Sequence, residues 1–415
     1  MACLSDARAA DEDQPEGQTG PGPSPRPRLW PLYAGGFLGP FGGAMVAAML
    51  PEIAEGLDTT VGVAAWSLTA YLIPFAALMV VSGTLAERWG RRRTLFVAYL
   101  TYVAASLLCA VAPSTSLFLS GRVLQGVANA FTTPILIATI SDLVAPSRLG
   151  GSIGTYGSLQ AAGQSFAPLV GGLAATVQWR LAFVGSVVAA LALATVLPPD
   201  TSPGGEAAAG EQREGRVRAL ANGKLALASI VAFLFHNTST GLTVLVALLA
   251  TDRFGLGPGP RGLVVAAFGV TGLLVGARLG RGVDRLGAVR FGVFAALALA
   301  VAAAAAGLAP TLPGVVAAVL LAGAATTAAR IAVTTLAVTS TPRNRGGATS
   351  MALACLFFGG SVAPLVWLPV YDVDHTVGLV ATASGALVAA VVLAAAEARR
   401  RTSLRGVRRA GALSA

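Results

Sequence analysis

The sequence predicts an all-α membrane protein whose twelve transmembrane helices form two six-helix halves related by a pseudo-two-fold axis along the membrane normal. The first observation behind this prediction is composition. Of 415 residues, 12% are charged and 55% are apolar, and the mean hydropathy is +0.72. Soluble proteins carry about 25% charged residues, which cover the core with a polar surface. This composition argues against a soluble globular enzyme and against a disordered chain.

The second observation is a regular series of apolar spans. A helix needs ~20 apolar residues to cross the hydrocarbon core of a bilayer. Twelve stretches come close to this requirement, at residues 30–50, 61–82, 94–112, 117–141, 150–176, 181–197, 225–250, 261–279, 291–309, 313–339, 348–369 and 376–396.

Polar segments divide the chain further. Residues 198–224 are rich in Pro, Gly, Ala, Glu and Arg and predict a flexible cytoplasmic linker between an N-terminal half at 30–197 and a C-terminal half at 225–397. Residues 1–29 lack the basic start and apolar stretch of a signal peptide and predict a disordered cytoplasmic tail. Residues 398–415 predict a basic cytoplasmic tail.

The distribution of basic residues predicts that both termini are cytoplasmic. With the N-terminus inside, 24 of the 29 Lys and Arg residues fall on the cytoplasmic side. The first outer loop carries Glu52, Glu55 and Asp58 and no base. Because basic residues concentrate in the cytoplasmic loops of membrane proteins, we expect a multi-pass protein of the cell membrane.

The remaining composition limits the partners. The net charge of +10 includes a cluster of arginines at 399–409, which we expect to contact anionic lipid at ~1 kcal/mol per residue. Nucleic-acid binding is the weaker interpretation. Three cysteines and two histidines show neither a disulfide pattern nor metal-ligand spacing. We therefore expect a lipid bilayer and a small-molecule substrate as partners, no metal or cofactor, and a monomer.

The third observation is an internal repeat. At a shift of 196, residues 146–170 and 342–366 are identical at nine of 25 positions, including the Ala-Pro-Leu-Val runs that start at Ala167 and Ala363. At a shift of 197, residues 83–93 match 280–290. The shift covers six spans, an even number, so the two halves share one orientation. Such repeats are typical of transporters whose halves rock around a central site.

Three motifs resemble those of the major facilitator superfamily, and the resemblance covers residues 30–397. The segment Gly83–Arg93 is similar to the G-x-L-a-D-R-x-G-R-[KR] signature, with Glu87 in the Asp position. Residues 122–126 are similar to R-x-x-Q-G. Span five resembles the G-x-x-x-G-P-x-x-G-G motif of drug:proton antiporters, with Ala167 in place of one Gly; its residues are Gly163, Ala167, Pro168, Gly171 and Gly172.

The first motif predicts a gate at the cytoplasmic mouth. The resemblance implies that Glu87 and Arg88 latch neighbouring helices in one state and release them in another. Glycines in this loop permit close contact and a tight turn. The alternative is that Arg91 and its neighbours only fix topology. The set comprises Gly83, Glu87, Arg88, Gly90 and Arg91, with a weaker second copy at Gly280, Asp284, Arg285 and Gly287.

Polar residues within the spans predict a substrate or proton pathway. Arg122 costs ~2.5–3.5 kcal/mol at mid-helix by insertion scales, so it should face protein or water. Gln125 and Asn129 follow on the same helical face. This stripe predicts either a cavity wall, with Arg122 binding an anion or tuning a carboxylate, or a buried hydrogen-bond network. Arg330 is a second charge within a span, and it does not match Arg122 under the repeat.

Spans seven and five supply the other predicted residues. The resemblance implies that spans one, four, seven and ten surround the cavity. His236 and Asn237 lie near the middle of span seven, where His236 either titrates near neutral pH or hydrogen-bonds a neighbouring helix. In span five, Gly163, Ala167 and Gly171 recur at every fourth position and predict close helix packing. The resemblance implies a seal against ion leak.

The proton carrier is less clear from the sequence. No Asp or Glu lies at mid-membrane, and the nearest acids are Glu52, at the outer end of span one, and Asp142, at the inner end of span four. Related antiporters are expected to carry an acid in span one, for which Glu52 would substitute. The alternative is that Glu52 is an exposed acid in a loop.

Together these features predict a transporter that exports small, amphipathic or drug-like molecules by alternating access, driven by the proton gradient. Direction and coupling rest on the resemblance. Few polar groups line the expected cavity, which favours an apolar or aromatic substrate over a sugar. One alternative is an importer or facilitator of a small organic anion. A membrane enzyme is a weaker alternative, because no cluster of catalytic residues is visible. A receptor would need an appended soluble domain.

Overall fold

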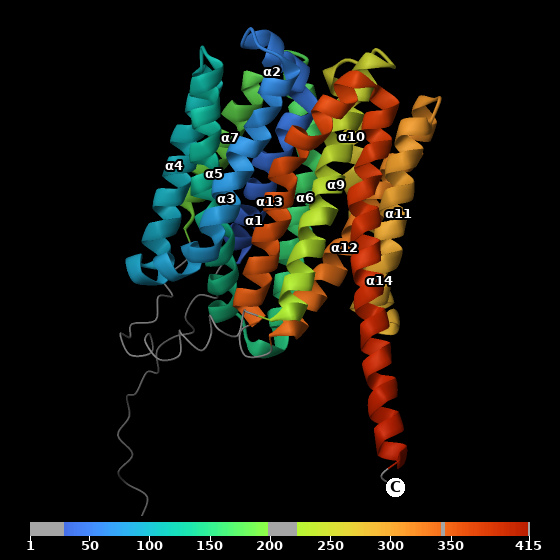
Figure 1. Ribbon diagram of the computed structural model, residues 1–415. Helices are drawn as coiled ribbons and strands as arrows, with labels where there is room; N and C mark the ends of the chain where they lie inside the picture. Colours follow the sequence, from blue (N-terminus) through green and yellow to red (C-terminus); the bar gives the residue numbers. More distant parts are fainter. Residues whose placement is uncertain (1–28, 198–221, 342–344, 414–415) are drawn as a thin grey trace, which may run out of the picture.

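The computed structural model describes residues 29–197, 222–341 and 345–413, and within these ranges every regular element is a helix (Figure 1). The first half of the chain contains α1 Trp30–Ala44, the 3₁₀ helix η1 Met45–Met49, α2 Leu50–Gly56, α3 Val61–Trp89, α4 Arg91–Val111, α5 Thr115–Leu143, α6 Pro146–Ala175 and α7 Arg180–Thr195.

The second half repeats this series. It contains α9 Gly223–Asp252, α10 Pro258–Leu286, α11 Ala288–Leu308, α12 Leu312–Ser340, α13 Arg345–Val373 and α14 His375–Leu413. Ten helical stretches of the described chain are long and apolar enough to cross a membrane. The Gly-rich α6 and the short apolar α7 run beside them (Figure 1). The prediction of an all-α, multi-pass membrane protein is confirmed.

A shift of 197 residues relates the helices of the two halves. Adding 197 to the first and last residue numbers of α3, α4 and α5 gives those of α10, α11 and α12. The turns between the helices repeat as well. Gly90 ends α3 with φ 85°, and Gly287 ends α10 with φ 80°. These backbone angles favour glycine because a Cβ atom is strained there.

Helix packing follows the same symmetry. Within the first half α1 packs on α6, α3 on α5, and α4 on α5 and α7; within the second half α9 packs on α13, α10 on α12, and α11 on α12 and α14. The halves meet where α3 contacts α13 and where α6 contacts α10. Each of these interfaces is the symmetry equivalent of the other, so the two halves are related by a pseudo-two-fold axis that runs along the bundle.

Glycines set the closest helix crossings in both halves. A Cβ atom on Gly126 of α5 would collide with the carbonyl of Tyr71 in α3, and one on Gly323 of α12 with the carbonyl of Phe268 in α10. The partners are again 197 residues apart. Helices in a membrane associate through such contacts because lipid gives no hydrophobic driving force between them. The packing of each half therefore depends on glycine at matched positions.

The first span differs from its prediction. The sequence predicts one stretch at 30–50, whereas α1 ends at Ala44 and the chain continues through η1 and α2 to Gly56. The Gly42 carbonyl, just before this change, accepts a hydrogen bond from Arg122 of α5. The change places Glu52 on a short terminal helix.

The bundle has two distinct ends, which we name by the elements that lie there. The α2 end carries α2, at the top in Figure 1, and the α3–α4 end carries the Gly90 turn. At the α3–α4 end, α14 continues as one helix to Leu413, where the sequence predicts a separate tail from 398. Predicted tail residues 1–28 and linker residues 198–221 lie outside the described ranges, so the division into these segments stays a proposal.

Candidate functional site

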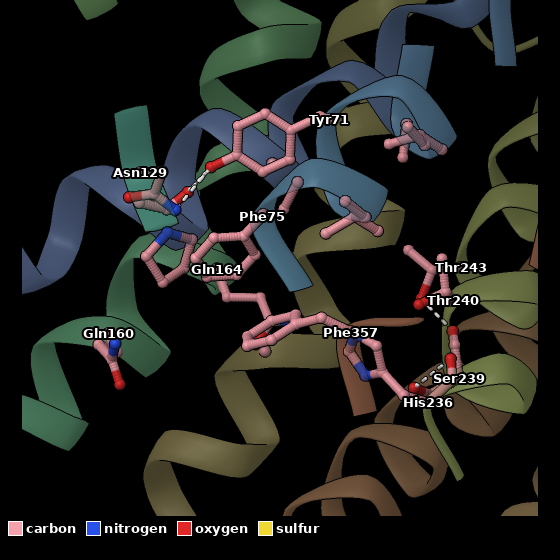
Figure 2. A pocket seen from close by; sticks show the side chains of 18 of the residues that line it. Tyr71, Phe75, Asn129, Gln160, Gln164, His236, Ser239, Thr240, Thr243 and Phe357 are labelled. Carbon is pink, nitrogen blue, oxygen red and sulfur yellow. Dashed lines mark hydrogen bonds between the residues drawn. The ribbon is translucent and has the colours of Figure 1, made fainter. Parts of the chain in front are cut away.

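A central cavity lies between the two halves (Figure 2). Its volume is about 150 Å³, and each half contributes four α-helices to its wall, with the 3₁₀ helix η1 of the first half in addition. The wall combines aromatic and aliphatic side chains with a small number of polar groups. The polar groups come from Tyr71 of α3, Asn129 and Thr133 of α5, Gln160 and Gln164 of α6, His236, Ser239, Thr240 and Thr243 of α9, and Arg330 of α12.

The first half supplies a fixed polar cluster. The Tyr71 hydroxyl donates to the Gly39 carbonyl at 2.8 Å, and the Asn129 amide donates to the Tyr71 hydroxyl at 2.9 Å. The Thr132 hydroxyl donates to the Asn129 side-chain oxygen at 2.8 Å. Gly39 leaves the space that the Asn129 side chain occupies. This cluster holds one predicted residue, Asn129, at the cavity wall.

The second half supplies the charge of the wall. Arg330 donates to the side-chain oxygen of Gln164 at 3.0 Å, a bond that joins α12 to α6 across the two halves. Among the described lining residues Arg330 is the one with a permanent charge, and none of them is Asp, Glu or Lys. His236 also lines the cavity, with its ring 5.7 Å from that of Phe357 and nearly perpendicular to it. Two more predicted residues are therefore at the cavity.

Aromatic rings from opposite halves meet across the cavity. Phe75 of α3 and Phe357 of α13 pack edge to face, with ring centroids 4.6 Å apart (Figure 2). A cavity of about 150 Å³ is the size that holds one benzene ring, whereas drug-sized ligands occupy about 300–1,000 Å³. A larger ligand would therefore need the two rings to separate.

Arg122 and Gln125 correct one interpretation of the polar stripe. Arg122 is buried, donates to the Ser67 and Gly42 carbonyls and to Gln125, and stacks on the Tyr71 ring at 4.4 Å. Gln125 in turn donates to Ser106 at 2.7 Å. Neither residue lines the cavity. The structure thus favours the buried network over the cavity wall, because helical rotation turns these positions toward α1, α3 and α4.

Asn237 likewise lies beside the cavity and does not line it. Its amide donates to the Gly359 carbonyl at 3.1 Å, and its oxygen accepts from the Trp367 indole at 2.9 Å. Both partners belong to α13, so Asn237 fixes the crossing of α9 and α13. A position one residue after His236 points about 100° away from it on a helix, which explains the difference.

Glu52 pairs across the halves at the α2 end. It forms an ion pair with Arg261 of α10, whose side chain is 1% exposed. Arg261 also donates to the Ala48 carbonyl at 2.7 Å and to the Thr251 hydroxyl at 2.6 Å. The alternative of an exposed loop acid is wrong for Glu52. The sequence places Arg261 on the outer side, at the start of the span 261–279, and its position beside two prolines gives no sign of a partner more than 200 residues away.

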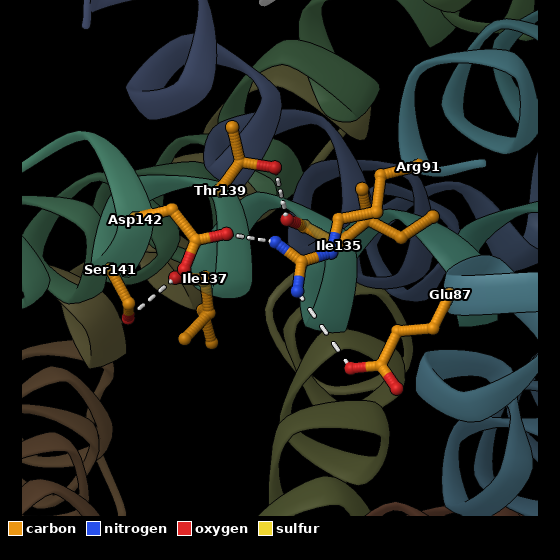
Figure 3. A network of polar contacts seen from close by, with 7 residues as sticks. All are labelled: Glu87, Arg91, Ile135, Ile137, Thr139, Ser141 and Asp142. Atoms are coloured by element: carbon orange, nitrogen blue, oxygen red, sulfur yellow. Dashed lines mark hydrogen bonds and ion pairs between the residues drawn. The ribbon is translucent and has the colours of Figure 1, made fainter. Parts of the chain in front are cut away.

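The predicted gate loop forms a charge cluster with a different arginine (Figure 3). Arg91 lies between Asp142 of α5, with which it forms an ion pair, and Glu87, at 3.7 Å. The Arg91 side chain is 9% exposed, whereas Arg88 is exposed. The charge that is held against a neighbouring helix is therefore that of Arg91, which goes against the alternative that Arg91 only fixes topology, while the gating role of Glu87 and Arg88 stays a prediction. Glu87 lies in the last turn of α3 and Arg91 begins α4 after the Gly90 turn, so this contact joins two successive helices.

The second copy of the loop lacks this cluster. Position 288, the equivalent of Arg91, is Ala, and position 339, the equivalent of Asp142, is Thr. Arg285 is exposed and Gly280 has open space around it; the side chain of Asp284 lies outside the described part of the structure. At the same end Arg290 of α11 instead donates to Glu397 of α14 at 2.8 Å.

The antiporter-type motif of α6 packs against both halves. Cβ atoms on Gly163 and Gly171 would collide with the carbonyls of Phe37 and Met45 in the first half. Gly172 lies against Gly262 of α10 in the second half. Ala167 and Pro168 are buried in the same stretch. The prediction of close packing by this helix agrees with these contacts, and its role as a seal against ions stays a prediction.

Sequence reasoning missed the aromatic wall of the cavity. Tyr71, Phe75, Phe268 and Phe357 stand in apolar spans, where aromatic residues more often face the core or lipid. The available signal for this wall was a glycine at a helix crossing, such as Gly126, which packs against the backbone of Tyr71. No group of three or more His, Cys, Asp or Glu suited to a metal occurs within the described residues.

Comparisons with known proteins fit this architecture. The profile of the Major Facilitator Superfamily matches residues 32–364. In its fold the chain is similar to a bacterial homologue of the lysosomal transporter Spinster in an inward-facing, unoccupied conformation, with a TM-score of 0.71, 17% identity and coverage of 88% of this chain and 95% of that one. A D-xylose–proton symporter gives a TM-score of 0.71 at 16% identity, with coverage of 88% and 96%.

Curated relatives match over shorter segments. The puromycin resistance protein pur8 of Streptomyces alboniger is 33% identical over 187 residues, covering 43% of this chain and 37% of that protein. A multidrug resistance protein B homologue of Mycobacterium tuberculosis is 33% identical over 149 residues, covering 35% and 28%. The probable actinorhodin transporter of Streptomyces coelicolor is 28% identical, covering 38% and 29%. The chain thus spans about a third of the length of these relatives.

Proposed function

Because the chain belongs to the major facilitator superfamily, whose model matches most of its length, we propose that it exports small amphipathic or drug-like molecules from the cytoplasm in exchange for protons. The transporter works by alternating access as a monomer in the cell membrane. The observation that carries the proposal is the central cavity, which both halves line, together with an ion pair that joins the halves at the α2 end.

The basic residues supply the orientation. The positive-inside distribution assigns the α3–α4 end and both termini to the cytoplasm. The Glu52–Arg261 pair then lies at the outer face. In this arrangement the pair would close the outer path to the cavity, and separation of α3 from α13 beside Phe75 and Phe357 would admit a substrate from the cytoplasm.

The cavity wall supports an amphipathic substrate. Aromatic and aliphatic side chains form most of the wall, and polar groups stand at a few positions. Such walls bind apolar bodies through buried area and orient them through few hydrogen bonds. Names of the partial relatives, which refer to multidrug resistance, puromycin and actinorhodin, point to aromatic organic molecules as cargo.

We propose His236 as the proton carrier of the exchange, since the described lining of the cavity contains no carboxylate. An imidazole can gain and lose a proton, and this one lines the cavity that a substrate would occupy. Glu52 instead holds the outer closure. Loss of its charge would remove the partner of Arg261 and favour opening, so Glu52 is proposed to act as a latch.

A plugged cavity tests the export proposal. Cells producing the intact protein or Thr240→Trp, which fills the cavity, are compared for tolerance to a panel of aromatic compounds that includes puromycin. We expect tolerance with the intact protein and its loss with Thr240→Trp. The matched control is Val388→Trp on the exposed face of α14, which should retain tolerance. If the plugged and intact proteins protect equally against every compound, the proposal is wrong.

A second candidate function is import or facilitated transport of a small organic anion. It is favoured by Arg330, a permanent cation in a lining without a described acid. Proteoliposomes separate the two candidates. Exchange predicts proton movement opposite to the substrate, and this movement should stop in His236→Gln. Substrate movement along its own gradient with no proton flux would favour the facilitator.

A further inference from the structure

A second cavity lies on the outer surface of the first half, away from the central site. Its volume is about 580 Å³. We call it the α4–α5 groove, and it is lined by Arg88, Trp89, Arg93, Thr94, Val97, Ala98, Thr101, Val127, Ala128 and Phe131. We propose that the α4–α5 groove binds an anionic phospholipid from the membrane leaflet at the α3–α4 end.

The charges of the groove favour an anionic headgroup. Arg88 and Arg93 both line it, both are exposed, and neither has an acidic partner among the described residues. The nearby acids Glu87 and Asp142 are both turned toward Arg91. Two uncompensated guanidinium groups match the oxygens of a phosphate, which they bind with short, charge-assisted hydrogen bonds.

The backbone adds to this preference. α4 begins at Arg91, so Arg93 stands in its first turn, and Thr94 is the first residue whose N–H is bonded back, to the Gly90 carbonyl. The first turn of a helix exposes unpaired N–H groups and carries the positive end of the helix dipole. The 21-residue α4 therefore presents positive potential to the same end of the groove as the two arginines.

The apolar part of the groove suits an acyl chain. Val97 is exposed, and Ala98 and Ala128 form a floor with side chains too small to fill the groove. Trp89 stacks on Phe131 with ring centroids 6.2 Å apart, which makes one aromatic wall. Tryptophan is enriched at the level of lipid headgroups. The arginines, the aromatic wall and the apolar floor of the groove thus match the headgroup, the interfacial region and the acyl chain of a phospholipid.

The equivalent positions of the second half do not combine these features. Leu286 replaces Trp89, Ala328 replaces Phe131, and Arg290, which replaces Arg93, is bonded to Glu397. The helix bounds of the two halves repeat at a shift of 197 residues, but the charged and aromatic side chains of the groove do not. A requirement of the fold alone would be expected in both halves.

Quenching of Trp89 fluorescence tests the proposal directly. The full-length protein is reconstituted in nanodiscs with increasing fractions of dibrominated phosphatidylglycerol or dibrominated phosphatidylcholine, and the Trp89 signal is taken as the difference between the protein and Trp89→Phe. We expect phosphatidylglycerol to quench at several-fold lower mole fraction. Because a basic residue near the surface contributes roughly a five-fold gain for anionic lipid, Arg88→Gln and Arg93→Gln should each lower the preference about five-fold.

The matched control is Arg92→Gln, which removes an exposed charge from the same turn but does not line the groove. It should retain the preference. Unchanged quenching by phosphatidylcholine in all variants shows that the groove is intact. The proposal is overturned by equal quenching from both lipids in the unmodified protein, by a preference that survives Arg88→Gln/Arg93→Gln, or by an equal loss in Arg92→Gln. Competition by inorganic phosphate alone would also overturn it, since the lipid would then not be required.

Discussion

The two halves of the molecule share a backbone plan and differ in where they place charge. Helices α3, α4 and α5 recur as α10, α11 and α12 at one shift, with glycines at the same crossings. At Arg122 and Gln125, however, the second half has Val319 and Ala322; at Arg330 the first half has Thr133. Packing is thus repeated, while the buried network belongs to the first half and the cavity cation to the second.

The difference indicates two roles for charge within the spans. Arg122 is fully enclosed and bonded to backbone carbonyls, so its contribution is mainly to the structure of the first half. Arg330 is partly exposed at a cavity and contacts one side chain of the opposite half. We expect its contribution to be mainly to ligand binding and to the meeting of the halves. Four experiments test where the two halves are alike and where they differ.

The largest effect is expected from Arg122→Ala. This change removes three hydrogen bonds from a buried charged donor, and a hydrogen bond to a charged group contributes roughly 1.5–3 kcal/mol. We expect the free energy of unfolding in detergent to fall by about 3 kcal/mol. Arg330→Ala, the control from the other half, should lose less than about 1 kcal/mol because its bond reaches a cavity wall. Equal losses would contradict the distinction between the two arginines.

Replacing the glycines at the helix crossings should lower the stability of the protein nearly as much, and by the same amount in both halves. Gly126→Ala and Gly323→Ala each bring a methyl group against a carbonyl of the neighbouring helix. Forcing helices apart in this way should lower stability by about 2 kcal/mol. Thermal unfolding of the two variants checks the symmetry. Gly185→Ala, where no atom lies within 4 Å of the added carbon, should be neutral; a cost in only one half would break the comparison.

The latch between the halves should change access more than stability. Glu52→Gln removes the charge that Arg261 faces at the α2 end. We expect the outer path to open, so that an impermeant maleimide added from outside labels Val244→Cys several-fold faster in a chain whose three native cysteines are replaced. Glu55→Gln on the same short helix is the control. Unchanged labelling in Glu52→Gln would show that helix packing alone closes this end.

The smallest effect is expected at the α3–α4 end, where one half has the charge cluster and the other lacks it. Arg91→Ala should lower stability by about 1 kcal/mol, since Asp142 and Glu87 are partly exposed and screened by solvent. Transfer of the pair to the second half, by Ala288→Arg with Thr339→Asp, should add no more than about 0.5 kcal/mol. Chemical unfolding of both variants and of each single change measures the coupling. Equal coupling in both halves would remove this asymmetry.

The sequence predicted the fold more fully than the site. Hydropathy placed the spans, and the repeat placed the pseudo-two-fold axis, because both depend on residue type at a fixed spacing. Three of the predicted pathway residues, Asn129, His236 and Arg330, do line the cavity. Arg122, Gln125 and Asn237 do not, since a stripe that avoids lipid can face a neighbouring helix as well as a cavity. Their proposed part in a substrate or proton pathway stays a prediction.

At the gate and the latch, the sequence did not show which charged residues form ion pairs. The motif at 83–93 identified a charged loop but not which arginine is held, and a local pattern cannot show that Asp142, some fifty residues away, is the acceptor. The Glu52–Arg261 pair is still more distant in sequence. Both pairs depend on how whole helices are rotated and tilted, which one sequence does not encode at any fixed spacing.

By itself the sequence determined that this chain is a membrane protein built from a duplicated six-helix unit, and it located the scarce charges. Apolar length and basic-residue bias suffice for this because the bilayer acts on each helix separately. The tertiary structure decided which of those charges are buried in helix packing, which face the cavity and which join the two halves. These outcomes depend on contacts between helices, where a rotation of about 100° per residue moves a side chain from a cavity to a neighbouring helix.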